Sequence, residues 1–289
     1  MPFDAFLASA WNDHGDRPRD VADRLAASLR IVTAPEHVAP YAGIVTHVFG
    51  EHLGEWDRGA RLLEALRGLP AFDRSAASES AVARSIGALR YAGGDGRALE
   101  ALPKDDRISA IAIAASAFAG RNAFGRALAA YGQALALAEP GLPPGPAALR
   151  ALAVGGNNLA SALEGKRDRD DAETRGMVAA AEAALRYWTL AGTWLEEERA
   201  HYRLARSLLC ARRPHDAVAS ARRCIDVCER NDAPAFERFF GHAVLAMAHR
   251  DAGEIDAFHA SRREATRWHV EVPEGERHWC RADLDELGG

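Results

Sequence analysis

Apolar positions recur at helical spacing along almost the whole chain. Alanine, leucine, arginine and glutamate fill long segments, and glycine, proline or an Asn-Asp pair interrupts them. Only residues 269–275 (HVEVPEG) alternate in the manner of a strand, and this run is too short to found a sheet. The pattern therefore predicts an all-α protein.

The interruptions divide the chain into helical segments joined mostly by short connections. The predicted helices are 3–12, 18–32, 36–53, 57–67, 75–91, 106–120, 123–138, 146–164, 172–191, 195–211, 214–230, 235–251, 255–269 and 277–287. Short connections force consecutive helices to lie antiparallel, so the chain is predicted to form a series of helical hairpins. The Pro-rich stretch 139–146 and the charged stretch 164–176 are the exceptions, and the first marks a bend or a seam.

One predicted helix shows how the hairpins would pack. Ala127, Tyr131 and Ala134 give a small, large, small order at positions i, i+4 and i+7. Two helices approach closely where small residues face each other, while a ring fills the gap one turn along. Pro140 and Gly141 then end the helix, so that the next hairpin can begin.

This spacing resembles the tetratricopeptide repeat (TPR), a helix-turn-helix unit of about 34 residues. The first matching set is Ile111, Ala115, Phe118, Ala127, Tyr131 and Ala134, with Pro140 one residue late. The second is Leu204, Ala205, Leu208, Ala217 and Cys224, although Ala221 and His201 stand where the family usually has aromatic residues. The likeness extends over residues 106–270 and is weak before them.

The resemblance implies a right-handed superhelical solenoid of antiparallel helix hairpins. Residues 1–104 would form degenerate N-terminal hairpins, 105–270 the TPR-like repeats, and 271–289 a C-terminal capping helix. Because the family signature is one of packing, it predicts a fold and no particular chemistry.

Charge and composition exclude several classes of function. A formal net charge of -5 and a pI near 6.1 do not favour nucleic-acid binding, which needs clustered Lys and Arg. The chain shows neither a basic leader nor an apolar run of about 18 residues, so we expect no membrane span and a cytoplasmic protein. The four cysteines are too few for a disulfide framework and are expected to be thiols packed between helices.

Catalytic and metal-binding motifs are not found. The sequence has no phosphate-binding loop, zinc-protease motif or nucleophile elbow, so we predict neither an enzyme nor a cofactor. His47 and His52 are five residues apart, which is poor spacing for one face of an α-helix, whereas His242 and His249 are seven apart and share a face. The histidines are interpreted as packing or titrating residues rather than metal ligands.

The segment 194–213 carries the candidate binding site. Arg199, Tyr202, Arg203 and Arg206 fall in one narrow sector of this helix, opposite its apolar face. In the TPR family the first helix of a hairpin lines the concave surface, so the resemblance implies that these side chains line a groove. The alternative is a solvated face whose arginines pair with the glutamates at 196–198.

Neighbouring helices would extend this groove through Asn157, His242 and His249. The leading hypothesis is a protein- or peptide-binding scaffold that recognises an anionic group, such as an acidic segment or a C-terminal carboxylate. The alternative is a self-association module in which Trp268, Trp279 and Leu284 contact a second copy in a homodimer, although these residues can equally cap the last repeat.

Overall fold

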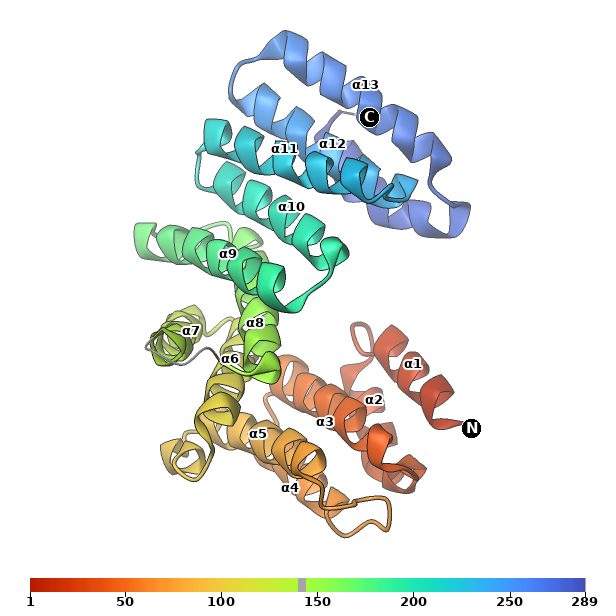
Figure 1. Cartoon of the computed structure of the whole chain (residues 1–289), viewed down its shortest axis with the longest axis vertical. Helices are drawn as coiled ribbons and strands as arrows, with labels where there is room; N and C mark the ends of the chain where they lie inside the picture. The colour runs from red at the N-terminus through yellow and green to blue at the C-terminus, as the bar shows by residue number, and fades with distance from the viewer. Residues whose placement is uncertain (140–143, 289) are drawn as a thin grey trace. The chain divides into compact units, whose positions relative to one another are not determined.

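The chain folds entirely into helices. The computed structural model describes residues 1–139 and 144–288, and across these residues it contains helices and no strand (Figure 1). The prediction of an all-α protein is confirmed.

The observed helices follow the predicted segments closely. They are α1 (Phe3–Asp13), α2 (Pro18–Ala27), η1 (Leu29–Ile31), η2 (Pro35–His37), α3 (Val38–Thr46), η3 (His47–Leu53), α4 (Trp56–Leu66), α5 (Ala76–Ala92), η4 (Gly96–Leu99), α6 (Lys104–Gly120), α7 (Phe124–Ala138), α8 (Pro146–Glu164), α9 (Asp171–Ala191), α10 (Trp194–Cys210), α11 (Pro214–Arg230), α12 (Ala235–Asp251), α13 (Ile255–Glu271), η5 (Glu274–Cys280) and α14 (Arg281–Glu286).

Three predicted helices are divided in the structure. The predicted helix 18–32 is α2 followed by the 3₁₀ turn η1, and 277–287 begins as the 3₁₀ segment η5 before α14. The predicted helix 36–53 contains a 3₁₀ turn, the α-helix α3 and the π-helix η3. The π-helix η3 changes which side chains of this segment lie on the same side.

The chain divides into two compact units, Met1–Leu159 and Ala160–Gly289, here called the N-terminal and the C-terminal unit. The division falls within α8. The predicted domain limits after residues 104 and 270 separate degenerate hairpins, TPR-like repeats and a capping helix. These limits remain predictions.

Consecutive helices pack against each other in the N-terminal unit. α4 lies against α5, α5 against α6, and α6 against α7. The stripe of Ala127, Tyr131 and Ala134 is buried, as predicted. The Tyr131 hydroxyl also donates a hydrogen bond to the carbonyl oxygen of Leu152 at 2.8 Å, which ties α7 to α8. Helix α7 ends at Ala138, while Pro140 and Gly141 lie outside the described residues.

The C-terminal unit continues the same arrangement from α9 to α13. Each helix packs on the next, α10 also contacts α12, and α14 packs on α12. Leu284 and Trp268 pack against the apolar cluster around Phe239, whereas Trp279 is 65% exposed. Of the three residues expected to cap the last repeat or to contact a second copy, two therefore lie against the unit's own core.

All four cysteines are free, and Cys224, Cys228 and Cys280 are buried between helices, as expected. Among the described residues, every helix is too short or too polar to cross a bilayer.

Overpacking tests the buried stripe on α7. Ala127 and Ala134 have no exposed surface, so Ala127→Leu or Ala134→Leu should lower the free energy of unfolding by about 1–3 kcal/mol. Ala129→Leu and Ala136→Leu, at exposed positions of the same helix, should be nearly neutral. Denaturant titration of the four variants measures the difference, and equal stabilities would show that this face is not the packed one.

Candidate functional site

Each of the three predicted arginines of α10 pairs with a carboxylate from another helix. The pairs are Arg199–Glu237 (2.6 Å from Nη2 to Oε1), Arg203–Glu164, and Arg206–Glu286 (2.7 Å from Nη1 to Oε2). Their carboxylates come from α12, α8 and α14 respectively, all within the C-terminal unit. The mutual repulsion of the three arginines is therefore relieved by carboxylates of the same unit.

The upstream glutamates have other roles in the structure. Glu196 forms a capping box with Thr193 at the start of α10. Glu198 is buried and accepts a hydrogen bond from the Cys224 thiol at 2.9 Å. The arginines of α10 are thus neutralised between helices, and spacing along one helix could not reveal these pairs.

The end of the chain lies along the predicted basic face. The Tyr202 hydroxyl donates to Asp283 Oδ2 at 2.8 Å, and burial raises the pKa of both groups. Arg250 of α12 donates to the Glu286 carbonyl oxygen, and Arg262 of α13 to that of Gly288, both at 2.7 Å. The acidic segment that contacts this face is the protein's own.

The remaining predicted residues do not join this cluster. Asn157 belongs to the N-terminal unit, where its amide lies 3.5 Å from Asn158 Oδ1. His249 is buried, and its Nδ1 lies 2.5 Å from Glu254 Oε2. His242 is half-buried, and this burial lowers its pKa. The structure therefore does not bring the seven predicted residues together within one unit.

The N-terminal unit contains a pocket of about 590 Å³ that no sequence pattern predicted. α3, α5, α6 and α8, which are labelled in Figure 1, supply most of its walls, together with Trp11 of α1 and two residues of η3. Small residues predominate in these walls, including Gly43, Ala81, Ala147, Ala151 and Gly155. We call this cavity the N-terminal pocket.

Glycine permits the close helix packing behind the N-terminal pocket. A Cβ atom at Gly155 would lie 3.0 Å from the carbonyl oxygen of Ala112, so α8 approaches α6 more closely than another residue would allow. Polar groups also reach the pocket, among them Arg84 of α5, Ser109 of α6 and Asn158 of α8.

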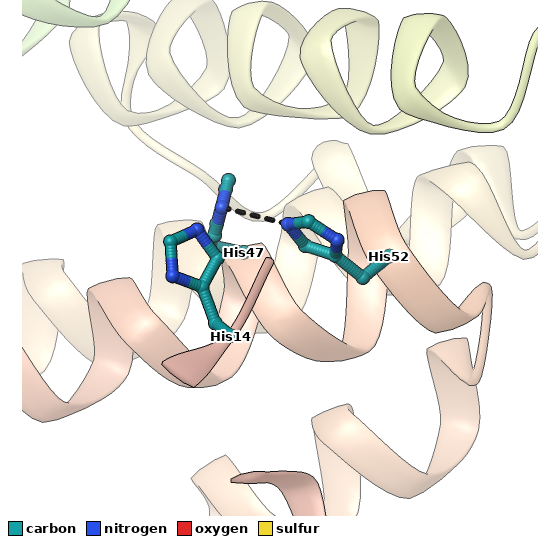
Figure 2. Close-up of side chains that lie close together, drawn as sticks. All are labelled: His14, His47 and His52. Atoms are coloured by element: carbon teal, nitrogen blue, oxygen red, sulfur yellow. Dashed lines mark hydrogen bonds between the residues drawn. The ribbon is translucent and has the colours of Figure 1, made fainter. Parts of the chain in front are cut away.

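Three histidines converge beside the N-terminal pocket. His47 and His52 lie on η3, and their Nε2 atoms are 3.1 Å apart (Figure 2). His14 follows α1, and its ring centroid lies 4.8 Å from that of His47 and 5.0 Å from that of His52. One ring nitrogen from each residue lies within 4.8 Å of the other two. Among the described residues, these three histidines form a cluster whose nitrogens are close enough together to hold one metal ion.

The π-helix explains why the spacing of these histidines was misleading. Residues five apart on an α-helix differ by about 140° in direction, which is why the spacing of His47 and His52 is poor for one α-helical face. In a π-helix the hydrogen bonds run from i to i+5, so residues five apart lie on the same side. The α-helical spacing rule does not apply here, because the backbone of His47–Leu53 is a π-helix.

Close packing accompanies the π-helix. A Cβ atom at Gly59 of α4 would lie 2.8 Å from Phe49 Cβ, and one at Gly120 of α6 would lie 3.0 Å from the Glu51 carbonyl oxygen. The segment ends at Gly54, whose φ of +66° suits glycine. Phe49 is fully buried on the side of the segment that faces the core.

Two of the three imidazoles have partners at their second nitrogen. His47 Nδ1 lies 3.1 Å from Glu51 Oε1, and His14 Nδ1 lies 2.5 Å from the Trp11 carbonyl oxygen. The pKa of His52 is lowered, first by burial and then by the neighbouring His47 and His14. Burial and the neighbouring imidazoles therefore disfavour the protonated ring of His52.

No protein-family model matches the sequence, and a search of curated proteins finds no significant match.

The buried carboxyl of Glu198 makes stability depend on pH. Burial raises its pKa to about 9, so the folded protein retains a proton that the unfolded chain loses above its ordinary pKa of 4.5. This contribution to stability is complete below that ordinary pKa and is lost as the pH rises through the folded value. In Glu198→Gln, which does not titrate, the unfolding free energy should fall less steeply between about pH 5 and 9.

Chemical denaturation at several pH values measures this slope. Glu197→Gln, at a half-exposed neighbouring position, serves as the control and should keep the wild-type slope. Identical slopes for Glu198→Gln and wild type would mean that Glu198 is ionised in the folded protein.

Proposed function

We propose that the protein is a binding module of the helical-repeat type whose N-terminal pocket receives a peptide segment of a protein partner. The consecutive packing of the helices and the buried stripe of Ala127, Tyr131 and Ala134 support a TPR-like solenoid. Its right-handed superhelical course is part of the proposal. Stacked helix pairs build an extended recessed surface without requiring catalytic groups.

The N-terminal pocket is the observation that carries this proposal. It is walled by the four α-helices α3, α5, α6 and α8, and at about 590 Å³ it is large enough for several side chains. Glycine and alanine on its walls allow a peptide backbone to approach the helices closely. On α10, in contrast, the corresponding surface is covered by the protein's own C-terminal residues.

The side chains of the N-terminal pocket indicate the chemistry of the peptide. Trp11 and Val154 are 40% and 37% exposed, and they offer apolar contact to a partner side chain. Arg84 is held by the Ser80 hydroxyl at 2.9 Å and lies 3.7 Å from Asp106, so its guanidinium is oriented before a ligand arrives. Together these groups favour a segment that carries an apolar side chain beside a hydrogen-bond acceptor such as a backbone carbonyl.

Filling the N-terminal pocket tests the proposal. Ala147 is exposed within the pocket, so Ala147→Trp should block it without disturbing the core. Peptides selected from a random display library on the wild-type protein should bind this variant about 10-fold more weakly or worse, as judged by fluorescence polarisation. Ala136→Trp, at an exposed position on α7, is the matched control and should bind as wild type does.

Two results would contradict the proposed pocket. One is a library selection that enriches no peptide. The other is equal binding of the selected peptides to Ala147→Trp and wild type.

The basic face of α10 is a second candidate, and the position of the C-terminal residues favours it. Asp283 and Glu286 already contact Tyr202 and Arg206, which supports the proposal that this face binds carboxylates. An acidic peptide must displace α14 to bind there. This second site of the binding module stays a prediction.

Weakening the internal contact tests the second site. The double variant Asp283→Asn, Glu286→Gln removes both carboxylates and should bind acidic peptides about 10-fold more tightly than wild type, with affinity falling as salt increases. Fluorescence titration at two salt concentrations provides the measurement. If the variant binds acidic peptides no better than wild type, the face serves only to hold the end of the chain.

A further inference from the structure

We propose that His14, His47 and His52 form a binding site for a divalent transition-metal ion of the zinc class. The proposal rests on the convergence of three imidazoles from two segments, α1 with its following turn and the π-helix η3 (Figure 2). It does not depend on the N-terminal pocket binding a peptide.

The spacing of the nitrogens suits a single ion. In tetrahedral coordination with Zn–N bonds of about 2.0–2.1 Å, two ligand nitrogens lie about 3.3 Å apart. The Nε2 atoms of His47 and His52 are 3.1 Å apart, and all three ligand nitrogens lie within 4.8 Å of one another. A shift of up to about 1.5 Å in the His14 ring closes the remaining difference.

The partners at the second nitrogens orient two rings for coordination. A metal-bound histidine typically donates its other ring N–H to a carboxylate or a backbone carbonyl. His47 Nδ1 is 3.1 Å from Glu51 Oε1, and His14 Nδ1 is 2.5 Å from the Trp11 carbonyl oxygen. With the proton on Nδ1, both residues direct an Nε2 lone pair to the centre of the cluster.

The backbone also supports this arrangement. Only a π-helix brings His47 and His52 to one side, and π-helical turns occur often at functional sites. Arg121, which directly follows α6, donates to the carbonyl oxygen of His52 at 2.8 Å, and this bond holds the end of η3 near the end of α6. The two ligands are therefore placed by the packing of this unit.

Three imidazoles leave one coordination position of a tetrahedral ion for water or an anion. His47 and Glu51 both line the N-terminal pocket, so the cluster borders that cavity. An exogenous ligand can therefore reach the ion from the pocket.

Metal titration of the untagged protein tests the site. Isothermal titration calorimetry with Zn²⁺ should show one saturable site, and Co²⁺ should give the visible absorption of a tetrahedral ion. Replacing any one ligand, as in His14→Gln, His47→Gln or His52→Gln, should lower the affinity about 100-fold or more. Glu51→Gln, which alters only the outer partner, should lower it by about 10-fold.

Controls separate a specific site from general binding to histidine. His215 has a side chain that is 76% exposed and lies in the other unit, so His215→Gln should bind as wild type does. Circular dichroism melts of each variant without metal identify any variant that fails to fold, and such a variant is replaced by the corresponding alanine variant. Azide added to the Co²⁺ form should shift the spectrum, because the fourth position accepts an anion.

Several outcomes would overturn the proposal. The site does not exist if Zn²⁺ shows no saturable binding, or if the three histidine variants bind as tightly as His215→Gln. A Co²⁺ spectrum that does not respond to azide would exclude the open fourth position.

Discussion

The close approach of neighbouring helices is the constraint on which this structure depends. Alanine and glycine at the contact positions let the helix axes come together, and larger residues then fill the gaps at the next turn. The buried stripe on α7 follows this rule, and the hydroxyl of Tyr131 adds a hydrogen bond to the backbone of α8. Small residues of α3, α5 and α8 also line the N-terminal pocket, where no larger side chain fills the space.

Packing of this kind also decides where charges are neutralised. Helices that lie close together bring side chains distant in sequence within reach, and the arginines of α10 find their carboxylates on α8, α12 and α14. The exposure of the paired side chains ranges from 7% for Glu237 to 56% for Arg199, and removing the partner of a buried member would leave its charge uncompensated between helices. The positive charges of Arg199, Arg203 and Arg206 on α10 are thereby each matched by a carboxylate in the folded unit.

The π-helix η3 shows how one local change of backbone creates a cluster. It departs from α-helical geometry where Gly59 and Gly120 let α4 and α6 press against it. The extra residue in its turn rotates His52 onto the side of His47, and α1 then brings His14 beside both. A helix of ordinary geometry would have separated the two imidazoles by a large angle.

The sequence alone determined the fold class and nearly all helix boundaries, because hydrophobic period, glycine, proline and capping residues act over a few neighbouring positions. The predicted burial of Ala127 and Ala134 follows from the same local pattern. Only tertiary structure decided which carboxylates pair with Arg203 and Arg206 and that Asp283 contacts Tyr202. It also decided the convergence of His14 with His47 and His52. Each depends on which distant segments pack together, and the histidine pair depends also on a π-turn that helix-helix contacts stabilise and that no local spacing rule of the α-helix contains.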